Sequence, residues 1–213
     1  MTKTKYLLHA VLLPVSLFAL HAAETTRSPQ ASAPVAATVL TEPADWRFEG
    51  MALPPGFAPD IKLAGVEEIR FAPGMFDPGS SDYFSYVVAV LADGAPELGP
   101  ADLKDFLEKY YRGLSVAVGR GKRLSPDPKQ MTVVVNPASA DSKAKGRFVA
   151  EVVFFDSFSD GRKISLHVEA IVIPRPAARQ TCAILLISPS SKDAPVWETL
   201  REIGGKAERK AGK

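Results

Sequence analysis

Reactive side chains are scarce in this sequence. It has a single cysteine, Cys182, and three histidines, two of which stand within the first 23 residues. One cysteine cannot form an intramolecular disulfide, so packing alone must stabilise the core. Structural zinc normally takes four nitrogen or sulfur ligands, which Cys182 and His167 cannot supply. We therefore expect no metal site, no cofactor and a buried, inert thiol at Cys182, because this residue stands in an apolar run.

An excess of charge of either sign is also missing. The chain has 26 basic and 24 acidic residues, and two of the basic ones, Lys3 and Lys5, stand near the N-terminus. Without them the two signs balance. Non-specific binding to nucleic acid needs a concentrated cationic excess, so the sequence predicts no nucleic-acid partner.

The first 23 residues have the three parts of a secretory signal peptide. Lys3 and Lys5 precede an apolar run over 6–20, and small residues follow at 22–23. The run is too short to span a bilayer comfortably. We expect residues 1–23 to be a signal peptide, which implies export to the periplasm or the extracellular space and no integral span in the mature chain. A retained N-terminal anchor is the alternative.

A linker, one domain and a tail follow in the prediction. Residues 24–43 are rich in Ala, Thr, Ser and Pro and have no apolar period, so they bury too little surface to offset their ordering entropy. We expect them to be disordered. Folded structure is predicted over 44–205 as a single domain, and residues 206–213 as a charged tail.

Apolar periodicity predicts the elements of that domain. Three- and four-residue spacing of apolar side chains indicates a long helix from Pro100 to Gly119, and a short helix is expected over 193–203. The last four predicted strands have no helix between them, which implies antiparallel pairing. The fold class is therefore α+β, a largely antiparallel sheet of about seven strands with one long and one short helix packed on it. The predicted strands are 45–53, 67–71, 83–91, 131–135, 147–158, 163–173 and 181–188.

Asp160-Gly161 is a turn pair typical of a two-residue β-hairpin, which would join strands 147–158 and 163–173. In that register Asp156 faces Ser165 and Val152 faces Glu169. One face would belong to the core, and the other would hold the polar residues. The predicted core face carries Val149, Val153, Phe155, Ile164, Leu166, Val168 and Val172.

The polar face of this hairpin raises the hypothesis of a hydrolytic site. His167 would act as base toward the Ser165 hydroxyl, with Asp156 or Glu169 orienting the imidazole. Side chains on one sheet face project in parallel, however, whereas a nucleophile and its base must point at each other. The segment also has no nucleophile elbow. A half-exposed polar sheet face is the interpretation that we favour.

The loop over 73–82 is a candidate contact surface. Its Pro-Gly start is followed by Met75 and Phe76, and Tyr83 comes directly after it. Exposed apolar side chains on a loop are typical of ligand or partner contacts. We therefore predict that Met75, Phe76 and Tyr83 bind a ligand or a partner.

Five segments carry a resemblance to known proteins: WRFE at 46–49, LPPGFAP at 53–59, GVEEIRFAPGMF at 65–76, YFSY at 83–86 and YYRGL at 110–114. They look like segments of small exported bacterial proteins of uncharacterised function. The order of the predicted elements is also loosely similar to that of the PsbP family of photosystem subunits. That similarity implies a fold and no activity.

These observations leave three hypotheses. The leading one is an exported, non-enzymatic binding or accessory protein that engages a protein partner or small ligand through a sheet face or the 73–82 loop. The alternative is a small hydrolase built on Asp156, Ser165, His167 and Glu169. The third is self-association into a homo-oligomer through an exposed sheet edge or face.

Overall fold

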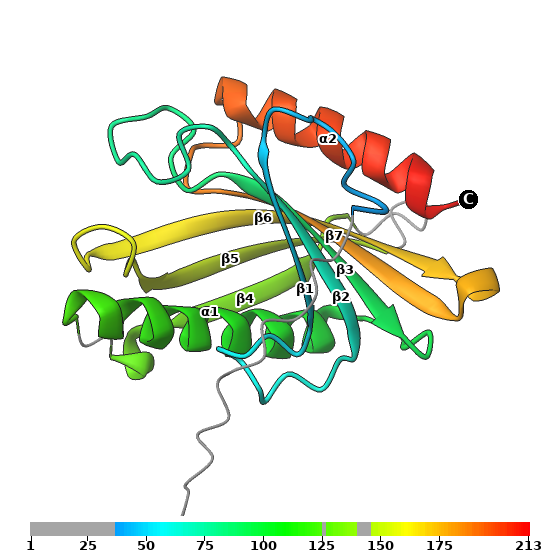
Figure 1. Ribbon diagram of the computed structural model, residues 1–213, viewed down its shortest axis with the longest axis horizontal. Helices are drawn as coiled ribbons and strands as arrows, with labels where there is room; N and C mark the ends of the chain where they lie inside the picture. Colours follow the sequence, from blue (N-terminus) through cyan, green and yellow to red (C-terminus); the bar gives the residue numbers. More distant parts are fainter. Residues whose placement is uncertain (1–36, 125–126, 140–145) are drawn as a thin grey trace, which may run out of the picture. The chain divides into compact units, whose positions relative to one another are not determined.

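A computed structural model describes residues 37–124, 127–139 and 146–213 (Figure 1). These residues belong to one compact unit, Ser32–Lys213. The predicted signal peptide, 1–23, and most of the predicted linker lie outside the described residues. Within the described ranges, no helix combines the length and apolar character needed to cross a bilayer.

The described residues form a seven-stranded, fully antiparallel sheet, which confirms the predicted α+β fold. The strands lie in the order β1-β2-β3-β7-β6-β5-β4, so β1 and β4 are the two edges. β3 and β7 are central and buried on both faces, as their nearly continuous apolar sequences predict. The strands are β1 (Arg47–Leu53), β2 (Gly65–Phe71), β3 (Tyr86–Asp93), β4 (Thr132–Pro137), β5 (Arg147–Phe155), β6 (Lys163–Arg175) and β7 (Gln180–Ser188).

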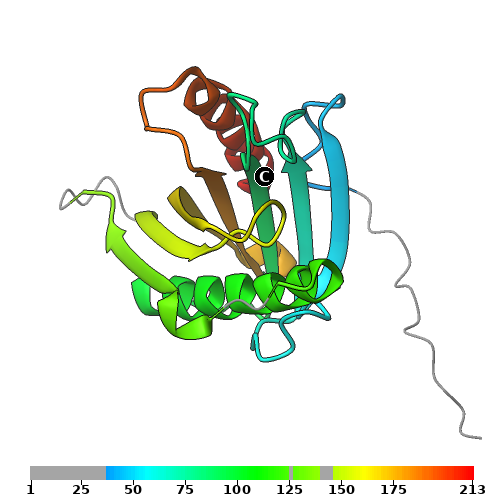
Figure 2. The ribbon, with the colours of Figure 1, turned by 90° about the vertical axis from the view of Figure 1, so that its left-hand side faces the viewer.

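Two helices cover opposite faces of the sheet (Figures 1 and 2). The long helix α1 (Pro100–Lys122) packs on β4 and β5, and α2 (Pro195–Ala211) packs on β7, β3 and β6. Short 3-10 helices, η1 (Pro128–Gln130) and η3 (Pro176–Ala178), lie in two of the connections. Because side chains alternate along a strand, neighbouring residues of one strand enter two different cores.

The two cores differ in their composition. Under α1, the buried side chains of Leu107 and Tyr111 pack with Phe154 and other rings in a core rich in aromatic residues. Under α2, Trp197 and Leu200 are fully buried and belong to a cluster with aliphatic residues of β3 and β7. Each such large apolar side chain contributes roughly 1.5–3 kcal/mol when it leaves water.

Both ends of the folded region extend beyond the predicted bounds. The C-terminal helix does not stop at Gly204-Gly205 but continues to Ala211, so most of the predicted tail, 206–213, is helical. Ala207 and Ala211 continue the buried stripe of that helix, which is the physical reason for its length. Gly204 is a packing position, because a Cβ there would lie 2.8 Å from the Leu186 side chain. At the N-terminal side, residues 39 and 40 of the predicted linker are buried.

The connection between β5 and β6 also differs from the prediction. A loop over 156–162 replaces the two-residue turn, and β5 pairs Glu151 with His167 and Val152 with Leu166. This register differs from the predicted one by three residues. Because three is an odd number, the side chains of β5 lie on the sheet face opposite to the predicted one. The predicted core residues of β6 at 166 and 168 are buried, but on β5 the buried residues are Ala150, Val152 and Phe154 instead of Val149, Val153 and Phe155.

Candidate functional site

The candidate site is a group of side chains at one end of the sheet, which we call the aromatic rim: Arg47, Phe71, Phe76 and Phe158. Because neighbouring strands are antiparallel, the start of β1, the end of β2 and the end of β5 all lie at this end. The loops over 72–85 and 156–162 extend from it toward the viewer in Figure 2. The topology therefore brings together residues that are far apart in the sequence.

The rim is built by ring contacts around Phe76. This side chain is 46% exposed, and its ring centroid lies 5.8 Å from that of Phe71 and 5.7 Å from that of Phe158. The guanidinium of Arg47 lies 5.7 Å from the Phe76 ring centroid and 5.9 Å from that of Phe71, within cation–π distance. Phe84, fully buried, supports Phe158 from beneath with a ring-to-ring distance of 5.6 Å.

Hydrogen bonds fix the loop that carries Phe76. The Asp82 carboxylate accepts the Gly74 N–H at 3.1 Å and also the Ser80 hydroxyl. A Cβ on Gly74 would lie 2.0 Å from an Asp82 oxygen, so only glycine fits against this carboxylate. The Phe84 N–H donates to the Met75 carbonyl at 3.1 Å. The loop therefore presents Phe76 on a defined backbone.

Of the three residues predicted to bind a ligand or partner, Phe76 is the one at the surface. Met75 is only 3% exposed and packs in the core under α1, so the predicted exposed Met–Phe pair is wrong. Tyr83 is 8% exposed, and its hydroxyl donates to the Asp156 carboxylate. Burial and this hydrogen bond raise the pKa of Tyr83 to about 12. Met75 and Tyr83 thus support the loop from inside.

Asp156 organises the second loop of the rim. Besides the Tyr83 hydroxyl, its carboxylate accepts the Phe158 N–H at 3.0 Å and the Ser159 hydroxyl at 2.7 Å. The end of α1 adds further anchors, since Lys122 donates its amine to the Phe158 carbonyl. These contacts hold Phe158 against Phe76. They also explain why the chain does not form the two-residue turn that Asp160-Gly161 predicts.

The residues of the hydrolase hypothesis are separated in the structure. Asp156 is buried and faces Tyr83, whereas the Ser165 hydroxyl donates to Glu151 at 2.8 Å. Within the described part of the chain His167 has no side-chain hydrogen bond, and it stands on the same strand face as Ser165. Glu169 is held by Arg201, with N–O distances of 2.7 and 3.1 Å. No nucleophile and base point at each other among these residues.

The structure also shows a buried polar group that the sequence analysis missed. Glu67 and Glu68 are both fully buried on β2 and point to opposite faces of the sheet. Glu67 accepts the Tyr110 hydroxyl at 2.7 Å, and burial raises its pKa to about 7. Glu68 binds backbone N–H groups of residues 38–40, and Arg70 binds carbonyls of the same segment. In the sequence, the sign of these buried acids is that two acidic residues stand next to each other inside a predicted strand.

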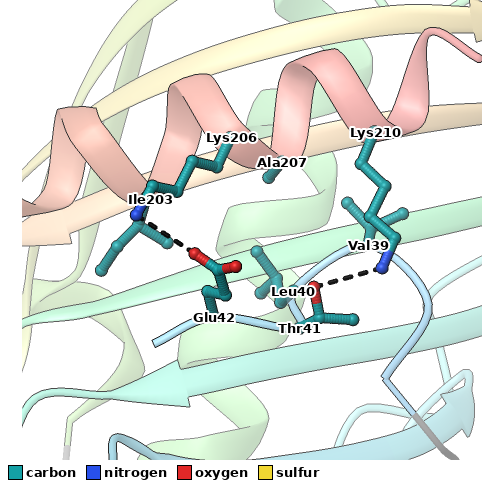
Figure 3. A pocket seen from close by; sticks show the side chains of 8 residues that line it. All are labelled: Val39, Leu40, Thr41, Glu42, Ile203, Lys206, Ala207 and Lys210. Carbon is teal, nitrogen blue, oxygen red and sulfur yellow. Dashed lines mark hydrogen bonds and ion pairs between the residues drawn. The ribbon is translucent and has the colours of Figure 1, made fainter. Parts of the chain in front are cut away.

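Several hollows lie away from the rim, including one beside α2 and one beside the start of α1. One of about 220 Å³ lies between residues 39–42 and α2, where Lys206 pairs with Glu42 and Lys210 donates to Thr41 (Figure 3). A groove of about 790 Å³ lies at the opposite end of the sheet from the rim, beside the start of α1. Its Arg175 is engaged by the Ala211 carbonyl and by Gln180. Among the described residues there is no group of three or more His, Cys, Asp or Glu placed to hold a metal ion.

Comparisons with known proteins assign no family to this chain. No protein-family model matches it, and neither a curated protein nor a solved structure shows significant similarity to it. The likeness to small exported bacterial proteins and to the PsbP family therefore stays a prediction.

Proposed function

We propose that this chain is an exported, non-enzymatic binding or accessory protein that contacts a protein partner through the aromatic rim. Export rests on the signal-peptide pattern of residues 1–23. A place in the periplasm or the extracellular space follows from it.

The observation that supports the proposal is an exposed phenylalanine held in a fixed setting. Phe76 presents nearly half of its surface to solvent, although two rings and Arg47 surround it. Aromatic and arginine side chains dominate the binding energy of protein interfaces. A rim that is already ordered loses little entropy on binding, so a partner with apolar side chains can use its full contact area.

We favour a binding function over a catalytic one because the polar side chains of the hydrolase hypothesis make structural hydrogen bonds. The Asp156 carboxylate accepts hydrogen bonds from residues of its own loop, and the Ser165 hydroxyl donates to the Glu151 carboxylate. A catalytic serine needs a base within hydrogen-bond reach and an oxyanion site beside it. Among the described residues, the Ser165 hydroxyl donates to the Glu151 carboxylate and makes no hydrogen bond to His167, so the serine–histidine pair of the hydrolase hypothesis is not formed, and we favour the surface over the reaction.

Three forms of the protein test this proposal: the unchanged chain, Phe76→Ser and Val134→Ser. Val134 on β4 is the matched control, because among the described residues it is the other large apolar side chain with high exposure, 55%. Each form is immobilised, exposed to an envelope extract, and the retained proteins are quantified by mass spectrometry. We expect at least one protein, other than a second copy of this chain, that the unchanged chain and Val134→Ser retain and Phe76→Ser loses. Retention of the same set by all three forms would contradict the proposal.

A further inference from the structure

We propose that the protein forms a symmetric dimer in which the β4 edges of two copies pair in antiparallel fashion and join the two sheets into one. An unpaired edge strand presents a row of free backbone N–H and C=O groups, and natural proteins usually guard such edges with charge, proline or a covering segment. The two edges of this sheet differ in that respect.

The β1 edge is guarded by charge, whereas the described residues of β4 carry no charge and one proline, Pro137, at the end of the strand. β1 carries the charged pair Arg47 and Glu49, and two prolines follow it directly. β4 has the sequence TVVVNP, without any charged side chain, and three consecutive β-branched valines favour extended pairing. Val134 on this strand is 55% exposed, although its neighbour Val133 is buried.

The ladder with β5 shows which groups of β4 are free. Ala138 donates its N–H to the Arg147 carbonyl at 3.0 Å, in continuation of the β4–β5 register. Hydrogen-bonded pairs alternate along an antiparallel ladder, so Val134 and Asn136 also direct their backbone groups toward β5. Val133 and Val135 therefore direct their N–H and C=O groups outward. The proline at the end of the strand supplies a carbonyl only.

A register centred on Val134 satisfies both the free groups and two-fold symmetry. In this symmetric dimer the two copies are related by a two-fold axis perpendicular to the sheet. Each residue of β4 then lies opposite a residue on the same sheet face of the second copy, and the residue on the axis lies opposite its own counterpart. If the residue on the axis is Val134, Val133 exchanges two backbone hydrogen bonds with Val135 of the second copy. By symmetry, Val135 exchanges two more with Val133 of the second copy. Val134 then meets the Val134 of the second copy as a non-hydrogen-bonded pair, the arrangement that brings side chains closest.

The side chains of β4 are self-complementary in this register. On the face toward α2, Thr132 lies opposite Asn136, so a hydroxyl meets an amide, and the exposed Val134 is covered by an equal side chain. On the face toward α1, Val133 lies opposite Val135. No like charges meet across the strand pair. These matched pairs identify a second copy of the chain as the occupant of this edge.

Sedimentation velocity over a wide range of protein concentration tests the dimer. The unchanged protein should reach the mass of a dimer, and Val134→Lys should stay a monomer under the same conditions, because two ammonium groups would meet on the axis. The control is Ala52→Lys, which adds the same charge to an exposed position of the β1 edge and should leave the dimer intact. A circular dichroism melt of each variant checks that it folds.

Cysteine cross-linking tests the register. Cys182 is fully buried and should not react, so a new cysteine is the one available thiol. Val134→Cys should oxidise to a covalent dimer, since a non-hydrogen-bonded pair has a Cα–Cα distance of about 4.5 Å, within the range of a disulfide. Thr132→Cys, on the same strand face but off the axis, should not. A monomeric unchanged protein at every concentration, or equal cross-linking by both variants, would overturn the proposal.

Discussion

Glu67 and Glu68 are neighbours on β2, and both are fully buried, but their surroundings differ sharply. Glu68 points toward α2, where its carboxylate accepts the N–H groups of Thr38, Val39 and Leu40 and the Thr38 hydroxyl. Glu67 points toward α1, where one oxygen accepts the Tyr110 hydroxyl and the other has no hydrogen-bond partner among the described residues. The two carboxylates are therefore equally buried, but the protein gives Glu68 more hydrogen-bond donors than Glu67.

Because the two acids are equally buried, the number of hydrogen-bond donors around each carboxylate is what distinguishes them. Backbone N–H groups replace the water that Glu68 loses, and Arg70 completes the arrangement by binding the carbonyls of residues 40, 41 and 46. Glu67 has one donor, so desolvation dominates and raises its pKa to about 7, with Glu49 adding repulsion. Glu68 therefore anchors a segment, whereas Glu67 makes the core sensitive to pH.

The largest expected effect is that of Glu68→Gln. The amide keeps one acceptor oxygen but turns an NH₂ group toward backbone donors, so in either orientation at least one N–H group among residues 38–40 loses its partner. We expect the free energy of unfolding to fall by about 3–5 kcal/mol. Urea denaturation measures it. Hydrogen exchange within residues 38–40 should become faster as well, and a loss below about 1 kcal/mol would contradict the anchoring role.

Glu67→Gln should have a smaller effect that depends on pH. The folded-state pKa of about 7 is above the ordinary 4.5, so the unfolded chain releases its proton first as pH rises. Stability of the unchanged protein should therefore fall between pH 4.5 and pH 7 and then level off, by about 3 kcal/mol in total. Glu67→Gln removes this loss. If the free energy of unfolding depended on pH in the same way in the unchanged protein and in Glu67→Gln, Glu67 would not be the group that titrates.

Tyr110→Phe should sharpen the comparison further. Among the residues that the structure describes, the Tyr110 hydroxyl is the one donor to Glu67, and this hydrogen bond lowers the pKa of the carboxyl. Its removal should cost about 1 kcal/mol and extend the fall in stability to higher pH. The measurement is the pH at which stability levels off. An unchanged levelling point would show that the hydroxyl does not solvate Glu67.

The smallest effect is expected for Thr38→Val. This change removes one hydroxyl donor from Glu68 but keeps the three backbone donors. Because Glu68 remains well solvated, we expect a loss of about 0.5 kcal/mol, seen as a lower urea midpoint with an unchanged slope. A loss as large as that of Glu68→Gln would mean that the hydroxyl, and not the backbone, holds the carboxylate.

Local patterns were sufficient to predict most of the fold. The apolar runs of β3 and β7 and the stripe of α1 correspond to elements that are buried where the pattern requires. The register of β5 could not be predicted in this way. It depends on Asp156, which binds Tyr83 from a distant part of the sequence and thereby replaces the local preference of Asp160-Gly161 for a tight turn.

The candidate site was predictable only in part. Composition pointed to the 73–82 loop and to Phe76, but the alternation of buried and exposed residues within an irregular loop has no period, so the burial of Met75 was not foreseen. The sequence pattern places Phe158 in a strand, whereas in the structure it lies in the loop after β5, and its place in the rim depends on that loop. The two buried acids were visible as a pair in GVEEIRF, because adjacent strand residues in a sheet covered on both faces must enter both cores.

The central claim is that Phe76 lies in a contact with a protein partner. Site-specific photo-crosslinking in the cells that produce the protein tests this most directly, with the photoreactive residue at position 76 in one strain and at the exposed position 52 of β1 in another. We expect a cross-linked product with a second, different protein from position 76 and none from position 52. Absence of any product from position 76, or the same products from both positions, would contradict it.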